Sequence, residues 1–185
     1  YKIGHETMDE DGTANWSYAI ADEVCFEWIK FPRSDFEFET IIHCVRDPFK
    51  AIPSIVYTET CCTPNPDNWG WNNVYKSTEY RFRHLNIDFK DYIVNQAIRS
   101  FLGWNELIEK MNPNLTVRVE HPLDDIKGKY DIPLNFELPS RTTNSTSHNS
   151  LTQDQWNKVD KDLLDKLEEF CIKHNYLSIK DRIKQ

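Results

Sequence analysis

The sequence is poor in glycine and lacks long apolar runs. Only five of its 185 residues are glycine, and they are widely spaced: Gly4, Gly12, Gly70, Gly103 and Gly128. A loop that cradles a phosphate with backbone N–H groups uses closely spaced glycines, and the sequence contains no such cluster. No apolar run approaches the roughly 20 residues that cross a bilayer, so we expect no membrane-spanning helix.

Cysteine is also scarce, and its spacing does not match the common zinc motifs. The five cysteines are Cys25, Cys44, Cys61, Cys62 and Cys171, and no pair has C-x-x-C spacing. No histidine cluster lies near them at the spacing of a zinc site. Adjacent cysteines rarely bond to each other, so we expect reduced thiols that are buried or half-buried.

Positive charge is in the minority. The 22 Lys and Arg residues are outnumbered by 30 Asp and Glu, which gives a net charge of −8. This balance argues against a protein whose whole surface binds nucleic acid, although it permits a local basic pocket for a small anion. Aromatic residues make up 13% of the chain, far more than a disordered tail carries. The length suits a single domain over residues 1–185.

Strand-like and helix-like segments alternate along the chain. The β-branched run TIIHCV at 40–45 stops at Arg-Asp-Pro and predicts a buried strand. Asp47 suits an N-cap and Pro48 a first helical position, so a helix should begin there. Farther along, apolar residues recur at helical spacing over 94–111. The segment 114–120 then predicts another strand.

The C-terminal part predicts one long helix. Thr152 and Gln155 have the spacing of a capping box, and the helix should end near His174 and Asn175. Apolar residues line one side of it: Trp156, Val159, Leu163, Leu167 and Phe170. Alternating strands and helices favour an α/β domain with a mostly parallel sheet flanked by helices.

Arg46 and Ser54 are candidate anion-binding residues. In open α/β sheets, ligands bind at the carboxyl ends of strands, where the next helix presents free N–H groups and a positive dipole end. Arg46 would lie at such a strand end, and Ser54 about two helical turns farther on, facing the same crevice. A guanidinium and a hydroxyl together suit a phosphate monoester. The alternative is an ordinary strand–turn–helix in which Arg46 pairs with a surface carboxylate.

These residues and three other segments resemble the sulfotransferase family. VRDPFKAIPS at 45–54 resembles the strand, arginine, proline and helical serine that hold the 3′-phosphate of the donor 3′-phosphoadenosine 5′-phosphosulfate. Segments 3–19, 101–126 and 140–156 resemble, in the same order, the Gly-His-Glu segment, the Trp-rich helix with its Arg-Val-Glu strand, and the segment that covers the donor. The resemblance extends over nearly all of the chain and implies a P-loop sulfotransferase-like fold.

The resemblance implies transfer of a sulfuryl group from this nucleotide to a hydroxyl or amine acceptor, in principle without a metal. Such a transfer needs a base for the acceptor's proton and cations for the sulfuryl and phosphate oxygens. His5 and Glu6, just past a predicted strand end, are the candidates for the base, and a local turn pair is the alternative. Arg141 would close over the 3′-phosphate, or else be an ordinary loop arginine.

Two further groups of residues have an open role. Trp69, Trp71 and Trp104 can wall an acceptor pocket, as aromatic rings do for carbohydrates, or fill the core, and for Trp104 on its helix the core is the preferred interpretation. Arg118 and Glu120 alternate along a predicted strand and so share a face. They are expected to form a structural ion pair or to support the site.

Two features depart from the family pattern. The family's first strand and its Gly-Ser/Thr-rich loop for the 5′-phosphosulfate have no counterpart in the sequence, which starts at Tyr1. Pro53, directly before Ser54, removes an N–H inside the predicted helix. The alternative function is therefore a non-catalytic structural or binding module that retains the fold. A nucleotide kinase of related fold is a weaker third candidate, because no carboxylate can be placed for its magnesium ion.

Overall fold

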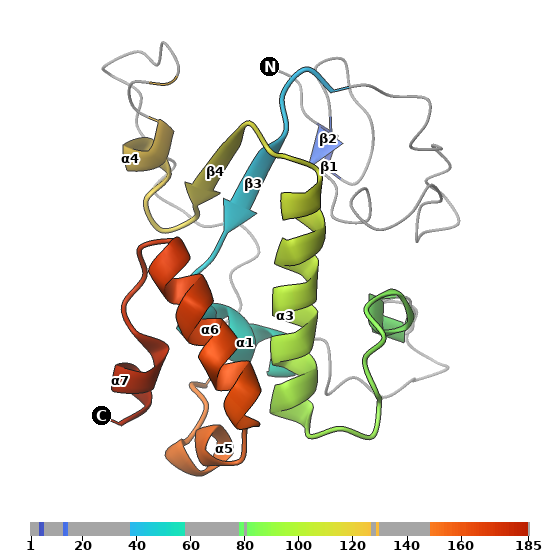
Figure 1. The fold of residues 1–185 in the computed structure, drawn as a ribbon, viewed down its shortest axis with the longest axis vertical. Coiled ribbons are helices and arrows are strands. Elements are labelled where there is room, and N and C mark those ends of the chain that lie inside the picture. The colour runs from blue at the N-terminus through green and yellow to red at the C-terminus, as the bar shows by residue number, and fades with distance from the viewer. Residues whose placement is uncertain are drawn as a thin grey trace.

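The computed structural model describes residues 4–5, 13–14, 38–57, 78–79, 81–126, 129 and 149–184, with only the backbone described at 4–5 and 13–14. The strands are β1 (Gly4–His5), β2 (Thr13–Ala14), β3 (Ile42–Val45) and β4 (Leu115–Arg118). The helices are α1 (Pro48–Ile55), α3 (Ile93–Lys110), α4 (Pro122–Ile126), α5 (Gln153–Asn157), α6 (Lys161–Lys173) and α7 (Ile179–Ile183). The described residues form a mixed α/β structure with several helices (Figure 1), which confirms the predicted class at this level.

Parallel pairing is the rule in both described sheets. β3 pairs with β4, with Ile42 opposite Leu115 and Val45 opposite Arg118, and β1 pairs with β2. β3 was predicted to be a buried strand, but only every second residue is buried, because one face of the strand packs against the helices. His43 and Val45 point into the protein, whereas Ile42 is 50% exposed.

Helix α1 begins where the sequence predicts. The Asp47 carboxylate accepts a hydrogen bond from the Phe49 N–H at 3.0 Å, and Pro48 occupies the first turn. Pro53 lies inside the helix and is buried, and the helix nevertheless continues to Ile55. The strand β3, the turn at Arg46 and the start of α1 therefore form the unit that the Arg-Asp-Pro pattern indicates.

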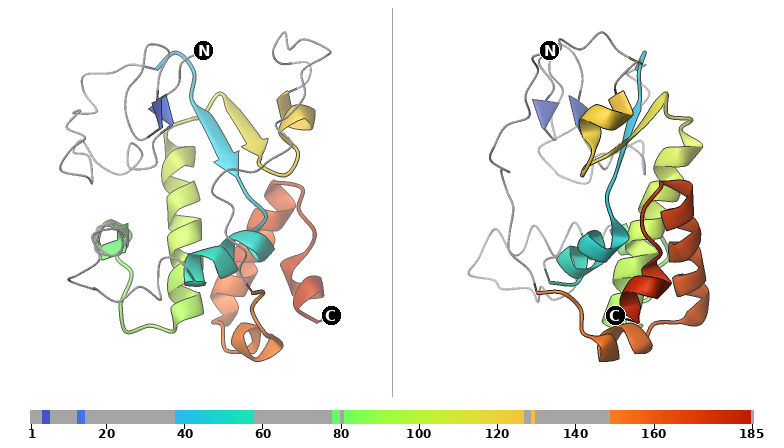
Figure 2. Two further views of the ribbon diagram at one scale, coloured as in Figure 1. Left: turned by 180° about the vertical axis from the view of Figure 1, so that it is seen from behind. Right: turned by 90° about the vertical axis from the view of Figure 1, so that its left-hand side faces the viewer.

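The core lies where α3 and α6 pack together. α3 buries Val94, Ala97, Ile98, Phe101 and Leu102, and α6 buries Leu163, Leu167, Phe170 and Cys171. The rings of Phe101 and Phe170 meet edge to face with centroids 4.9 Å apart. The three views show the two helices side by side, with α1 crossing near the carboxyl end of β3 (Figures 1 and 2). Burying each large apolar side chain contributes about 1.5–3 kcal/mol, so this contact supplies much of the fold's stability.

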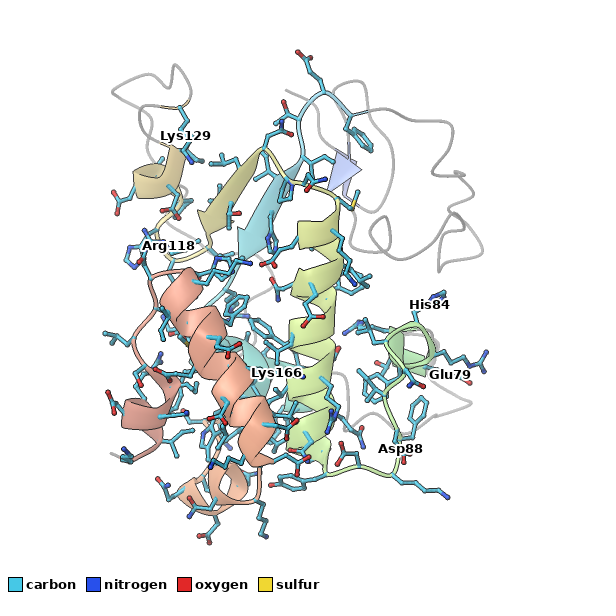
Figure 3. The ribbon with its side chains drawn as sticks, in the orientation of Figure 1. Glu79, His84, Asp88, Arg118, Lys129 and Lys166 are labelled. Atoms are coloured by element: carbon cyan, nitrogen blue, oxygen red, sulfur yellow. The ribbon has the colours of Figure 1, made fainter. Side chains whose placement is uncertain are left out.

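The segment before α3 packs on the side of that helix away from α6 (Figures 1 and 3). Its approach is close: a β-carbon at Gly103 would lie 2.9 Å from the Leu85 Cδ2 atom. Phe82 is buried, and its ring centroid lies 4.9 Å from that of Phe89. This packing holds Arg81 beside α3.

The predicted capping box at the start of the C-terminal region is confirmed. The Thr152 hydroxyl accepts from the Gln155 N–H at 3.3 Å, and the Gln155 side-chain oxygen accepts from the Thr152 N–H at 2.8 Å. The predicted end near His174 is also confirmed, because α6 ends at Lys173 and Asn175 has a positive φ of 56°.

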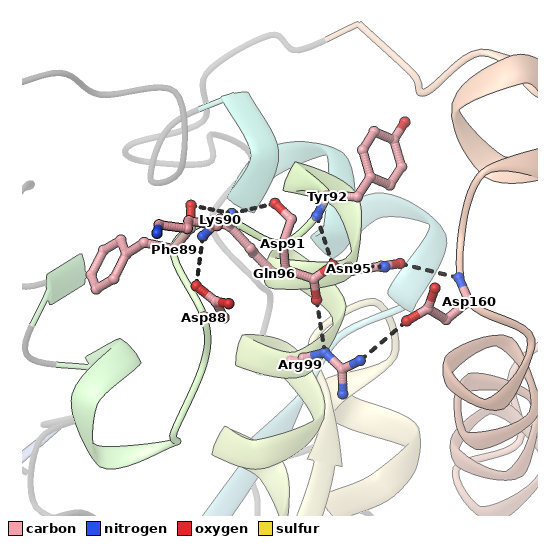
Figure 4. Close-up of polar contacts among 9 residues, drawn as sticks. All are labelled: Asp88, Phe89, Lys90, Asp91, Tyr92, Asn95, Gln96, Arg99 and Asp160. Carbon is pink, nitrogen blue, oxygen red and sulfur yellow. Dashed lines mark hydrogen bonds and ion pairs between the residues drawn. The ribbon is translucent and has the colours of Figure 1, made fainter.

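The single long helix predicted from Thr152 is wrong, because the chain breaks between α5 and α6. Asp160 is the N-cap of α6. Its N–H donates to the Asn95 side-chain oxygen at 3.2 Å, and its carboxylate pairs with Arg99 at 3.2 Å (Figure 4). Arg99 also binds Asp91 at 3.1 Å, which ties the break to the start of α3. Contacts with α3 therefore stabilise a break that the apolar spacing does not reveal.

The described residues include two of the five cysteines and several helices, for which the sequence predicts buried or half-buried thiols and no membrane span. Cys171 is buried as expected, whereas Cys44 is exposed, and both are free thiols. Cys25, Cys61 and Cys62 lie outside the described residues. No helix within the described residues is long and apolar enough to cross a membrane.

A candidate anion-binding pocket

A pocket of about 360 Å³ lies beside the carboxyl half of β3, between α1 and α3. The described residues that line it are Cys44, Arg46, Ala51, Ile55, Arg81, Ser100, Phe101, Trp104 and Asn105. Its size falls within the range of small-molecule sites. Two of these described lining residues are arginines and none is a carboxylate. The two arginines make this pocket a candidate for binding an anion, although the protein as a whole is acidic.

Arg46 lies directly after β3, as predicted, and its side chain is exposed. It shares a face with Cys44, since residues two apart on an extended chain point the same way. The Arg46 side chain makes no hydrogen bond or ion pair with any residue that the structure describes. No described residue occupies the planar fork of donors on its guanidinium, and such a fork matches the geometry of an oxyanion.

The N-terminus of α1 is not open to a ligand, contrary to our expectation. Asp47 accepts from the Phe49 N–H with its side chain, and from the Lys50 and Ala51 N–H groups with its carbonyl oxygen, at 3.0 and 2.9 Å. Pro48 has no N–H to offer. Because the protein's own Asp47 occupies this helix end, side chains rather than helix N–H groups must bind an anion in the pocket.

Ser54 is not brought into the pocket. It is half-buried and has contacts of its own, and α1 lines the pocket with Ala51 and Ile55 instead. The predicted pairing of Arg46 with Ser54 across one crevice is therefore not seen among the described lining residues. Ser54 does follow Arg46 by eight residues, but α1 faces the pocket with the side that carries Ala51 and Ile55.

The other predicted site residues cannot be compared with the pocket. His5 ends the short strand β1, for which only the backbone is described. Glu6, Arg141, Trp69 and Trp71 lie outside the described residues. Their proposed roles stay predictions.

Trp104 lines the pocket instead of filling the core. It is half-buried, and the Arg81 guanidinium carbon lies 5.8 Å from the centroid of its ring, as in a cation–π contact. Our preference for the core was therefore wrong for this residue. Ser100 and Asn105 are polar residues on the apolar face of α3, and this interruption was the sequence signal for a pocket wall.

A buried histidine fixes the amide group of Asn105. The Asn105 Nδ2 donates to the Phe101 carbonyl at 2.7 Å, so its Oδ1 faces the His43 Nε2 at 2.8 Å. The Nε2 must then carry the proton, which makes His43 a donor. Burial lowers the pKa of His43 below its usual 6.5, and the ring stays neutral near pH 7. Sequence reasoning missed this residue, because a histidine inside an apolar strand carries no distinctive spacing.

Arg118 and Glu120 do not form the predicted ion pair with each other. Arg118 pairs with Asp125 at 2.7 Å, near the junction between β4 and α4 (Figure 3). The two carboxylate oxygens of Glu120 accept from the Asp47 N–H at 3.2 Å and the Tyr176 hydroxyl at 2.9 Å. Glu120 thus supports the turn that carries Arg46, in agreement with the expected supporting role, through different partners.

Comparisons with protein-family models, with curated proteins and with solved structures find no match. Within the described residues, no group of three or more His, Cys, Asp or Glu side chains is placed to hold a metal ion. The candidate site rests on the geometry around Arg46.

Proposed function

We propose that the protein is a sulfotransferase-like domain of the P-loop type that binds 3′-phosphoadenosine 5′-phosphosulfate, with Arg46 holding the 3′-phosphate. In this proposal the domain transfers the sulfuryl group to a hydroxyl or amine acceptor, such as a carbohydrate. The observation that supports it best is the Arg46 side chain at the carboxyl end of β3, which has no ion-pair partner among the described residues and lies in a pocket without a described carboxylate. The order of strand, arginine, proline and helical serine at 45–54 adds support.

The walls of the pocket suit a ligand that combines an anion with an aromatic body. Arg46 supplies a cation at the strand end, and Trp104 and Phe101 supply aromatic surface on α3. A nucleotide has both parts, since its base offers a π-face to aromatic side chains. Ser100 and Asn105 add polar groups that can orient such a ligand.

A binding module that retains the fold without catalysis is the second candidate. Two observations favour it: Asp47 occupies the start of α1, and Ser54 does not line the pocket among the described residues. Arg46 then binds the anion without the partners that a transfer reaction uses.

The experiment is a calorimetric titration with adenosine 3′,5′-bisphosphate and with adenosine 5′-monophosphate, which lacks the 3′-phosphate. The wild-type protein should bind the bisphosphate more tightly. Arg46→Ala should weaken that binding by roughly tenfold to a hundredfold, because a hydrogen bond to a charged group contributes about 1.5–3 kcal/mol. Arg83→Ala is the matched control, since Arg83 pairs with Glu79 and is 73% exposed.

Two results would contradict the proposal: equal affinity for both nucleotides in the wild-type protein, or no change in the Arg46→Ala variant. Turnover is tested separately, by incubating the protein with the sulfated donor and a panel of hydroxyl and amine acceptors. Binding that depends on Arg46, together with no transfer to any acceptor, would favour the binding module.

A further inference from the structure

The backbone on both sides of Arg46 is held by side chains from distant parts of the chain. The single proton of the Tyr176 hydroxyl is shared between the Val45 carbonyl oxygen at 3.2 Å and the Glu120 carboxylate at 2.9 Å. Glu120 accepts from the Asp47 N–H at 3.2 Å. The direction in which Arg46 leaves the strand is therefore set partly by the C-terminal segment.

Arg182 on α7 binds the carboxylate of Asp47 through two parallel hydrogen bonds. Its Nη1 donates to Oδ1 at 2.8 Å and its Nη2 donates to Oδ2 at 3.0 Å. The guanidinium also lies over the ring of Phe49, with its carbon 4.1 Å from the centroid. Only 19% of the Arg182 side chain and 11% of the Asp47 side chain are exposed. A paired fork of this kind, partly withdrawn from water, is among the stronger polar contacts in proteins.

Asp47 is the chain neighbour of Arg46, and its charge opposes the binding of an anion there. With Arg182 and the Phe49 N–H in place, both oxygens of Asp47 are occupied. Without Arg182, a mostly buried carboxylate would be left without a charged partner, which is costly. Turning toward Arg46 would relieve that cost and would use the donors that a ligand needs.

We propose that Arg182 is a positioning residue for the anion pocket: by holding both oxygens of Asp47, it keeps this carboxylate from pairing with Arg46. The inference rests on the proposed function in one respect only, namely that Arg46 binds an anion. Arg182 itself does not line the pocket among the described residues.

The test compares the affinity for adenosine 3′,5′-bisphosphate of three variants with that of the wild-type protein. Arg182→Gln should weaken binding roughly tenfold, because Asp47 then competes for the charged donors of Arg46. The double variant Asp47→Asn with Arg182→Gln should recover wild-type affinity within about twofold, since asparagine still caps α1 but carries no charge. Lys180→Gln is the control on the same helix. It removes the ion pair with Asp165, which does not involve Arg46, and should leave affinity unchanged.

The recovery separates positioning from a purely structural role. If Arg182 only held α7 in place, the double variant would bind as weakly as Arg182→Gln or more weakly, and the proposal would be wrong. Unchanged affinity in Arg182→Gln would also overturn it. Thermal unfolding of each variant shows which proteins are folded at the assay temperature.

Asp47→Asn alone provides a second measurement if Arg182→Gln does not fold. It should bind the bisphosphate at least as tightly as the wild-type protein, because it removes the competing charge and keeps Arg182. Weaker binding would contradict the proposal. Arg46→Ala distinguishes a failure of the proposed anion site from a failure of the proposed role of Arg182. If that variant loses affinity while Arg182→Gln does not, only the role of Arg182 fails, and if Arg46→Ala has no effect, the anion site itself fails.

Discussion

Two buried histidines should make the free energy of unfolding depend on pH below about pH 6.5. His43 has no exposed surface and His174 is 9% exposed, and their rings meet edge to face at 6.1 Å. Burial lowers the pKa of both side chains from the usual 6.5. The Nδ1 atom of His43 has no hydrogen-bond partner among the described residues. A proton added there would be buried without an acceptor.

The direction of the effect follows from proton binding. Because the pKa of each histidine is lower in the folded protein than in the unfolded chain, the unfolded chain binds more protons near and below pH 6.5. The contribution of the two histidines to the free energy of unfolding should therefore be constant above about pH 7.5 and fall as the pH drops below 6.5. Each histidine that is neutral when folded and charged when unfolded contributes a slope of about 1.4 kcal/mol per pH unit, so two give at most about 2.7.

Neighbouring charges reduce this limit. Glu109 on α3 lies 3.5 Å from the His174 Nε2 and favours the charged form of both histidines, whereas Lys173 opposes it. Glu109 is itself paired with Lys173 at 2.6 Å, which weakens its effect on the rings. The slope should accordingly lie below the limit but remain clearly measurable.

Urea unfolding at half-unit steps from pH 7.5 to 5.0 measures the slope. His43→Gln keeps a donor for Asn105 and removes the titrating ring, and His174→Gln removes the other. Each should lower the slope by about half, relative to the wild-type protein. His121→Gln is the control, because that side chain is 56% exposed. A slope that persists in the double variant, or a wild-type protein equally stable at pH 7.5 and 5.5, would refute the reasoning.

Two other predictions concern stability. Leu167→Ala, at a position without exposed surface, should lower the free energy of unfolding by about 2–5 kcal/mol, whereas Ile172→Ala on the exposed side of the same helix should change it by less than about 0.5. Urea unfolding of both variants checks this, and equal losses would contradict the assigned core. Thr152→Ala should cost about 1 kcal/mol through loss of the cap, and Thr152→Asn should recover most of it. A thermal-unfolding series in which both variants lose the same stability would contradict the capping role.

The elements that the sequence predicts correctly are those with local causes. β3 and α1 follow from a β-branched run, an Asp cap and a proline at the first helical position, all within a few residues of one another. The capping box at Thr152 needs only four consecutive residues. Helix α3 follows from apolar spacing over 18 residues, a length at which periodicity is informative.

The predictions that failed depended on contacts outside the segment whose pattern was used. The apolar spacing of Trp156, Val159 and Leu163 continues across a break that Asn95 and Arg99 stabilise from about 60 residues away. Arg118 pairs with Asp125 on the next helix and not with Glu120, because β4 ends at Arg118 and Glu120 lies in the turn that follows instead of on the same strand face.

The residues of the candidate site also divide into those with a local cause and those that depend on packing between distant elements. Arg46 was predictable, since its place at a strand end is local. Arg81, Ser100 and Asn105 reach the pocket only through the packing of α3 against its neighbours. Ser54 was predicted from its spacing but does not line the pocket among the described residues. A spacing of eight residues does not decide which side of a helix faces a pocket that other elements form.

The contacts around Arg46 also determine when the pocket is complete during folding. Asp47 and Arg182 are 135 positions apart, and Val45 and Tyr176 are 131 apart. Closing loops of this length is unfavourable and slow compared with forming α3 or the cap at Thr152. During synthesis, the residues on either side of Arg46 can form all of these contacts only after residue 182 has been made. A chain cut just before α7 would therefore keep the contact between α3 and α6, but it would lose the buried Ile179 and Ile183 side chains and the two hydrogen bonds that Arg182 makes with Asp47.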